Sequence, residues 1–268
     1  LDVLITQTEN DMLNTNRFDF FPAIANNEGP DPNVSHRYRF MPTTEILGAL
    51  ENKGFHIVSA SQGHSTSPYA KHRIYMDHAD FKPFEITPGD TARLRVVLFN
   101  SHNRRGRFQL HVGSFRDVCE NTMVFGAHAA TSLVFRHQGD RLGDDFIEGV
   151  YRVIDESKST LATMREMAKT PMTEDQQMEF ASRAVKLRWA GTSPVELTDV
   201  IRARRVADVG SNLWLTYQRT QEALVRGGMQ GYTKTNKLRT IRALRSIDKD
   251  LKVNADLWNL ATEYLETT

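Results

Sequence analysis

Two short segments on either side of one polar loop constrain the fold most strongly. Apolar side chains occupy every second position of residues 93–99 and again of residues 107–113. Alternation with period two is typical of a β-strand that buries one face. The Asn, Ser and Gly residues between the two segments favour a hairpin loop. We therefore predict a β-hairpin whose buried face carries Leu94, Val96, Leu98, Phe108, Leu110 and Val112.

The rest of the chain predicts an α+β fold. Strand formers are enriched in residues 36–40, 55–62 and 70–76, and residues 42–54 have the apolar spacing and terminal glycine of a short helix. After about residue 139 the apolar residues recur every three or four positions, which indicates amphipathic helices. We expect an antiparallel sheet with a packed helix, followed by a helical half. The expected later helices are 144–168, 212–226, 236–247 and 254–266, with capping boxes at 173–176 and 193–196.

Three segments follow from this reading. Residues 1–33 are rich in turn formers and acids and are expected to form an irregular or loosely docked arm. Residues 34–138 are expected to form the α+β sheet core with the arginine-rich hairpin of residues 93–116, and residues 139–268 the helical region. With 268 residues, of which 40% are hydrophobic, the chain is long enough to bury a substantial core.

Hydropathy and cysteine content suggest where the protein resides. The sequence contains no apolar run of the ~18 residues that a membrane helix needs, and its first residues lack the pattern of a signal peptide. The single cysteine, Cys119, permits no internal disulfide. We expect a cytoplasmic protein that does not enter a membrane.

The near-neutral total charge of +1 conceals a strong segregation of charge. Residues 1–31 hold six acids and one base, whereas residues 201–245 hold ten bases and two acids. Residues 91–116 hold six arginines and no acid. Two concentrated basic segments of this kind favour binding to a polyanion.

Nucleic acid is the polyanion that these segments fit best. Arg and Lys side chains set along a strand or helix gain affinity by releasing counterions from the phosphate backbone, and the Arg guanidinium also matches phosphate in shape. Phe99 and Phe115 are candidates for stacking on bases. The candidate contact residues are Arg93, Arg95, His102, Asn103, Arg104, Arg105, Arg107, Arg116, Lys234, Lys237, Arg239, Arg242 and Arg245.

Catalytic and cofactor patterns are weak in this sequence. His64, His72 and His78 lack the spacing of a metal motif, and Cys119 beside an apolar valine has the character of a buried residue. The glycine-rich residues 227–231 lack the Lys-Ser/Thr of a phosphate-binding loop. We expect no enzyme, no cofactor and no resident metal.

Three sequence segments resemble a known family. They are Asn100-Ser101-His102, the segment from Gly113 to Asn121, and the segment from Asn254 to Trp258. In these the chain is similar, over about residues 40–266, to the phage/plasmid-like family catalogued as domain of unknown function 932. The chain departs from the pattern at Thr122, where a glycine is expected. The resemblance implies a protein of a phage, prophage or plasmid and no particular chemistry.

A fold-level likeness extends this interpretation. The expected helix, strand meander, arginine-rich 93–116 hairpin and later helices look like the single-strand-annealing proteins of the Rad52 type. The protomers of those proteins join into rings or filaments and bind single-stranded DNA along a basic groove. The leading hypothesis is therefore a homo-oligomeric protein that binds single-stranded DNA in annealing or recombination. Two alternatives remain open: an anti-defence factor that binds a host protein, and a metal-dependent nuclease that uses Asp77, Asp80 and Glu85.

Overall fold

The computed structural model confirms the α+β class and describes most of the chain. The described residues are 3–4, 18, 20–62, 65–106, 108–116, 122–124, 132–135, 148–151, 155 and 158–267, and for the three strands at 3–4, 122–124 and 132–135 the description covers the backbone. The strands are β1 (Val3–Leu4), β2 (Phe55–Ser61), β3 (His72–His78), β4 (Phe84–Thr87), β5 (Asp90–Asn100), β6 (Phe108–Arg116), β7 (Thr122–Val124), β8 (Ser132–Phe135), β9 (Gln230–Tyr232) and β10 (Leu238–Thr240). The helices are α1 (Pro22–Ala25), α2 (Thr43–Glu51), α4 (Lys158–Lys169), α5 (Glu174–Arg188), α6 (Leu197–Val200), α7 (Leu213–Arg226) and α8 (Ile247–Thr267), with a 3-10 turn η2 (Val206–Asp208).

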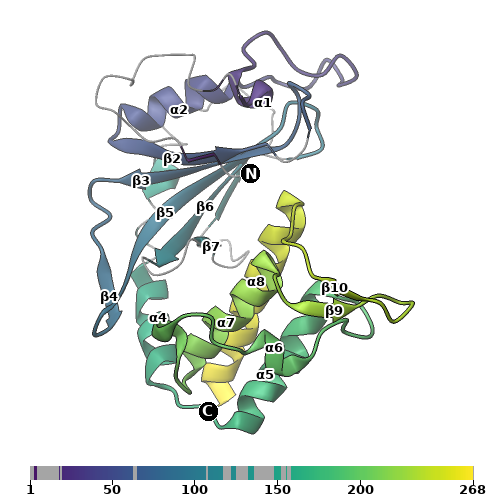
Figure 1. Cartoon of the computed structure of the whole chain (residues 1–268). Coiled ribbons are helices and arrows are strands. Elements are labelled where there is room, and N and C mark those ends of the chain that lie inside the picture. Colours follow the sequence, from purple (N-terminus) through teal and green to yellow (C-terminus); the bar gives the residue numbers. More distant parts are fainter. Residues whose placement is uncertain are drawn as a thin grey trace. The chain divides into compact units, whose positions relative to one another are not determined.

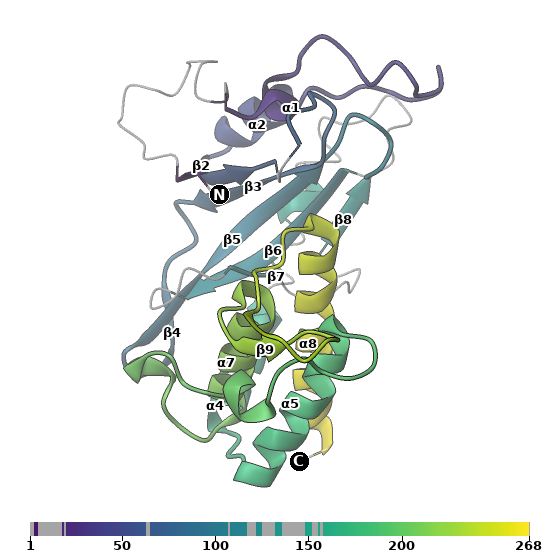
Figure 2. The same cartoon turned by 45° about the vertical axis from the view of Figure 1, so that its right-hand side comes forward.

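The main sheet is built on the predicted hairpin. Strands pair in the order β1-β2-β3-β5-β6, β4 pairs with β5, and β6 pairs with both β7 and β8. The pairings β1–β2, β2–β3, β3–β5, β4–β5 and β6–β8 are antiparallel (Figure 2). The six apolar residues that predicted the hairpin are buried, as are Val97 and Phe99 on the alternate positions of β5. The sequence predicted the two strands correctly but underestimated how much of β5 is buried.

The chain divides into two compact units that interleave along the sequence. Unit 1 comprises Leu1–Pro83, Arg93–Ser114 and His128–Ser157, and unit 2 comprises Phe84–Ala92, Phe115–Ala127 and Lys158–Thr268. Strands β5 and β6 each begin in one unit and end in the other. The linear segments with ends at residues 33 and 138 remain a prediction. No helix among the described residues is long and apolar enough to cross a membrane.

Unit 1 packs two helices against its sheet strands. Helix α2 contacts β2, and α1 contacts α2 (Figure 1). Ile46, Leu47 and Leu50 form the buried face of α2, as their spacing predicts. Ala23 and Ile24 of α1 are completely buried, so this part of the expected arm is a short helix docked in the core.

A buried polar cluster fastens α1 to the sheet of unit 1. The side chain of Asn100 donates to the Thr43 hydroxyl at 3.0 Å, which in turn lies 2.8 Å from Nε2 of His72. The ring of His102 is fully buried, with Nε2 2.9 Å from the carbonyl oxygen of Ala23. Side chains from a helix, two strands and a loop thus form hydrogen bonds away from water with one another and with the backbone of α1.

Unit 2 is organised around α7. This helix contacts α4, α5 and α8, and it is buried around nearly its whole circumference, including Trp214 and Tyr217. Its N-terminus is capped by Asn212, whose side chain accepts from the backbone N–H of Leu215 at 2.8 Å. Helix α5 starts with the predicted capping box of Thr173 and Gln176. Both helix starts therefore follow from local sequence.

A buried arginine at the end of β6 connects distant parts of unit 2. Nε of Arg116 donates to Asp90 at 2.5 Å, a second guanidinium nitrogen donates to Asp208, and the third donates to the carbonyl oxygen of Ala207 at 3.1 Å. The second carboxylate oxygen of Asp90 accepts from the indole of Trp214 at 2.9 Å. Burial opposes the charge on Arg116, but hydrogen bonds and attraction from both carboxylates outweigh it and raise its pKa.

Several local expectations are wrong. Residues 236–247 form no continuous helix, because β10 occupies Leu238–Thr240 and α8 begins at Ile247. The capping box expected at residues 193–196 does not form, since α6 begins at Leu197 after Glu196. Residues 36–40 contain no strand. The expected helix 144–168 is described as α4 and short helical pieces before it, and its other residues lie outside the described part.

Replacing Arg116 tests the importance of the buried network. Arg116→Met leaves Asp90 and Asp208 buried without their guanidinium partner, and we expect a loss of about 3–5 kcal/mol in unfolding free energy. The matched control is Arg183→Met, which removes an exposed pair with Glu263 and should cost less than about 1 kcal/mol. Urea unfolding of the three proteins measures the difference. Equal losses for the two variants contradict a structural role for Arg116.

Two buried histidines predict how stability depends on pH. Burial, together with the neighbouring His102 ring, lowers the pKa of His72 to about 3, and burial lowers that of His111 to about 4. The folded state keeps both rings neutral at pH values where the unfolded chain, with histidine pKa near 6.5, binds protons. Stability is therefore full above that value and falls as the pH decreases towards 4.

Chemical unfolding measures this dependence directly. Between about pH 7 and about pH 5 we expect the unfolding free energy to fall by about 2 kcal/mol for each of the two histidines. In His72→Gln the decrease in unfolding free energy should be smaller by about 2 kcal/mol, the contribution of one histidine. This difference does not depend on the variant's stability at neutral pH. An unfolding free energy that stays constant over this pH range contradicts the assignment of neutral buried rings.

Candidate nucleic-acid interface

The strongest basic surface lies on a hairpin inserted between α7 and α8. We call residues 230–245 the basic hairpin; they include β9, β10, the turn between them and the segment that leads to α8. The strands pair in antiparallel register, with Leu238 opposite Tyr232 and Arg239 opposite Gly231. In Figure 1 the hairpin extends outwards from the helices of unit 2. Its sequence therefore forms a projecting ribbon rather than the basic helix that the spacing predicted.

The turn of the basic hairpin is defined by several hydrogen bonds. The backbone N–H of Thr233 donates to the carbonyl of Lys237 at 2.9 Å, and the Lys237 N–H donates to the Thr233 hydroxyl at 3.0 Å. Asn236 adopts a φ of 56°, a conformation that Asn tolerates better than most residues. These features give the turn a defined shape before any ligand is present.

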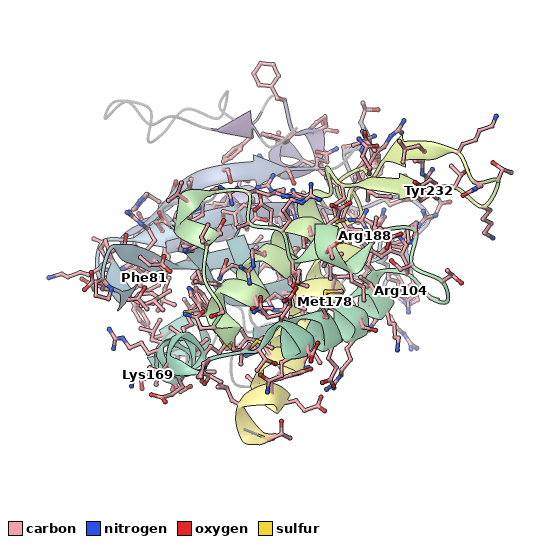
Figure 3. All side chains as sticks on the ribbon, turned by 60° about the horizontal axis from the view of Figure 1, so that its bottom comes forward. Phe81, Arg104, Lys169, Met178, Arg188 and Tyr232 are labelled. Carbon is pink, nitrogen blue, oxygen red and sulfur yellow. The ribbon has the colours of Figure 1, made fainter. Side chains whose placement is uncertain are left out.

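The base of the hairpin is anchored to unit 2. The backbone N–H of Tyr232 donates to the carbonyl of Pro194 at 2.8 Å. The guanidinium of Arg188 donates to the carbonyl of Arg242 at 2.6 Å and also to that of Leu224. Burial lowers the pKa of Arg188. Arg188 therefore serves to hold α7 and the hairpin together rather than to contact a ligand (Figure 3).

The cations of the hairpin are exposed and lack acidic partners. No Asp or Glu occurs between Glu222 and Asp248. Among the described residues, the five cations of the hairpin form no ion pair, whereas the basic residues Arg183 and Arg205 of unit 2 do. Nitrogen-tipped side chains gather at the outer end of the hairpin in Figure 3. The five exposed residues are Lys234, Lys237, Arg239, Arg242 and Arg245.

Unit 1 contributes a smaller basic loop between β5 and β6. Arg104 and Arg105 are exposed there, and Arg104 has a φ of 59°. Asn103 is half-buried, and its side-chain oxygen accepts from the backbone N–H of Arg105 at 3.1 Å. Arg93 is also half-buried. This loop places two adjacent guanidinium groups in solvent.

Three predicted contact residues are directed inwards instead. Arg95 is buried and donates to both carboxylate oxygens of Asp77, at 2.6 and 2.9 Å. Arg116 is held in the network of unit 2, and His102 lies in the polar cluster of unit 1. The expectation that these side chains face outwards is wrong, because each satisfies a buried group. Arg107 lies outside the described residues.

The predicted stacking and metal residues are also accounted for. Phe99 is buried against the edge of His111, and Phe115 is half-buried. Asp77 forms an ion pair with Arg95, and Glu85 accepts from the backbone N–H of Gly89 at 2.9 Å. The described part of the chain contains no group of three or more His, Cys, Asp or Glu residues arranged to hold a metal ion.

Comparison with known proteins identifies the family. The model described as Domain of unknown function (DUF932) matches residues 32–258. The chain belongs to the DUF932 family. The resemblance predicted from its three sequence segments is thereby confirmed.

Relatives of this DUF932 chain occur in Escherichia coli (strain K12). It is 30% identical over 236 residues to the UPF0380 protein YfjQ, covering 86% of this chain and 84% of the relative. It is 31% identical over 239 residues to the UPF0380 protein YafZ, with the same coverage of each chain. No solved structure matches. The likeness to annealing proteins of the Rad52 type and the ring or filament assembly therefore remain predictions.

Sequence reasoning missed one residue of the basic hairpin. Tyr232 has 49% of its surface exposed and lies on β9, where it is labelled in Figure 3. The sequence predicted a helix over residues 236–247, with Leu238 on its apolar face. That prediction gave no reason to pair Tyr232 with Leu238 across a hairpin. Leu238 is instead 61% exposed. The sequence feature that could have indicated Tyr232 is its position as an aromatic residue beside a turn, in a long stretch without an acid.

Gly227 at the junction of α7 and the hairpin provides a test of this architecture. It has a φ of 69°, and an added Cβ would lie 2.5 Å from the carbonyl oxygen of Ile241. Gly191 also has a positive φ, of 92°, but no atom lies within 4 Å of an added Cβ. Gly227→Ala should therefore destabilise the protein more than Gly191→Ala, whose cost of about 1 kcal/mol arises from backbone strain alone.

Hydrogen exchange and urea unfolding measure both variants. In Gly227→Ala the amides of β9 and β10 should exchange faster than in the parent protein, because the two chain segments must separate. Indistinguishable exchange in the two glycine variants contradicts the close approach at this junction.

Proposed function

We propose that this protein binds single-stranded DNA through the basic hairpin. The observation that carries the proposal is the set of five exposed cations in a stretch without an acid, none of them in an ion pair among the described residues. Exposed charges kept for solubility alone are normally interspersed with the opposite sign. A polyanion is the ligand whose chemistry such a surface matches.

The form of the hairpin supports the same ligand class. Two-stranded ribbons and their turns present side chains along a line, as a phosphate backbone presents its charges. Lys234 and Lys237 lie in or beside the turn, and Arg239 lies on β10. Arg242 and Arg245 continue the series towards α8. Guanidinium groups add paired hydrogen bonds to phosphate oxygens.

The exposed loop of unit 1 is a separate candidate for phosphate contacts, independent of the basic hairpin. Arg104 and Arg105 lie at the tip between β5 and β6. The biological role that we propose is annealing or recombination for a mobile element. That role extends the binding proposal and depends on it.

A salt titration with a fluorescent oligonucleotide tests the binding. Five phosphate contacts on a single strand predict that log K falls with log salt concentration with a slope of about −3.5. Replacing Lys234, Lys237 and Arg239 together by Gln should weaken binding and reduce the slope by about 2. The physical reason is that fewer counterions are released when fewer cations contact the strand.

A second triple variant controls for net charge. Lys169→Gln, Lys186→Gln and Lys252→Gln remove three exposed charges from α4, α5 and α8 without altering the hairpin. This variant should retain the slope and nearly all the affinity of the parent protein. Affinity that is independent of salt, or equal losses in the two triple variants, contradicts the proposed interface.

A further inference from the structure

The basic hairpin carries an apolar pair on its outward face. Tyr232 and Leu238 are direct cross-strand partners, so their side chains lie on the same face of the ribbon, with Cβ atoms about 5 Å apart. They are 49% and 61% exposed. Exposed apolar side chains are common singly, but an adjacent aromatic and aliphatic pair on a projecting ribbon forms a small platform.

The opposite face of the ribbon is packed against unit 2. Gly231, whose missing side chain would point away from the Tyr232 side, approaches its neighbours closely. An added Cβ there would lie 2.8 Å from the carbonyl oxygen of Pro194 and 2.8 Å from the side chain of Ile241. One face of the ribbon therefore packs against its neighbours at Gly231, and the other face, which carries Tyr232 and Leu238, is exposed to solvent.

Cations flank this platform along the chain. Lys234 follows Tyr232 by two residues, and Lys237 precedes Leu238 at the end of the turn. Arg239 pairs with Gly231, so its side chain starts from the other face of the ribbon, where it is nevertheless exposed. An unpaired nucleotide needs such an arrangement, because its base offers an apolar π face and its phosphate a negative charge. A bare acidic surface would use the cations but leave the tyrosine without a partner.

We propose that Tyr232 stacks on an unpaired nucleobase, with Leu238 supporting the same base from the neighbouring strand. This inference rests on the proposed function and identifies the part of the ligand that the hairpin recognises. Both faces of a base inside a duplex are covered by neighbouring base pairs, so Tyr232 cannot stack on it. We therefore expect the hairpin to prefer single strands to duplexes. The hydrogen bonds between Thr233 and Lys237 define the turn next to Tyr232 before a ligand binds. This reduces the conformational entropy that the hairpin loses on binding.

Binding of two fluorescent ligands tests the inference. One is an oligothymidylate and the other is an abasic strand of the same length, which keeps the phosphates but has no bases. Tyr232→Ala should weaken binding to the oligothymidylate by roughly 5-fold to 150-fold and leave binding to the abasic strand unchanged. Tyr232→Phe should retain most of the affinity, because its ring still stacks.

Tyr151→Ala is the matched control. Tyr151 is another exposed tyrosine, with 44% of its surface accessible, and it lies in unit 1 outside the hairpin. Its replacement should change neither affinity. A third measurement uses Tyr232→Trp, whose fluorescence should be quenched by the oligothymidylate and not by the abasic strand.

The outcomes separate the two proposals. If the parent protein binds neither strand, both proposals are overturned, and an acidic protein partner then becomes the ligand to seek. If the parent protein binds and the lysine variants weaken it, but Tyr232→Ala binds as tightly as the parent, stacking alone is overturned. A Tyr232→Ala loss of equal size on both strands also overturns stacking, because it indicates a disturbed hairpin.

Discussion

The buried guanidinium of Arg116 is the interaction on which the order of unit 2 depends. It joins Asp90 on β5 to Asp208 at the end of η2, and Asp90 also accepts from Trp214 on the central helix α7. Asp208 further accepts from Arg205, which in turn pairs with Glu222 at 2.6 and 2.7 Å. Each of the five charged side chains in this network has a partner of opposite sign, so the desolvation cost is offset only while all five stay in place.

This network also determines where free positive charge remains. Arg116 and Arg205 are committed to carboxylates, and Arg188 and Arg219 donate to backbone carbonyls. The cations left exposed and unpaired in unit 2 include those of the basic hairpin, which is tethered at its base and projects at its turn. The same residue type therefore stabilises the fold in one place and is offered to a ligand in another, according to which acids lie nearby.

Some elements of the fold were predicted from the sequence, and others were not. Period-two alternation predicted β5 and β6, and local capping signals predicted the start of α5. The basic hairpin was misread because Leu238, Ile241 and Leu244 recur every three residues, as on a helix. Only Ile241 of these is buried. Gly231 and Asn236 carry the contrary signal, since one permits close backbone packing and the other a positive φ.

The sequence by itself determined the α+β class, the main hairpin, the family and the segregation of charge, because these depend on periodicity, composition and local motifs. Only the tertiary structure decided which arginines face outwards, because a guanidinium is buried or exposed according to carboxylates that are far away in sequence. Arg95 and Asp77 are 18 residues apart and Arg116 and Asp208 are 92 apart. Nothing in the local pattern of a strand encodes such a partner, and so the exposed tyrosine and cations of the basic hairpin emerged as the candidate site only in three dimensions.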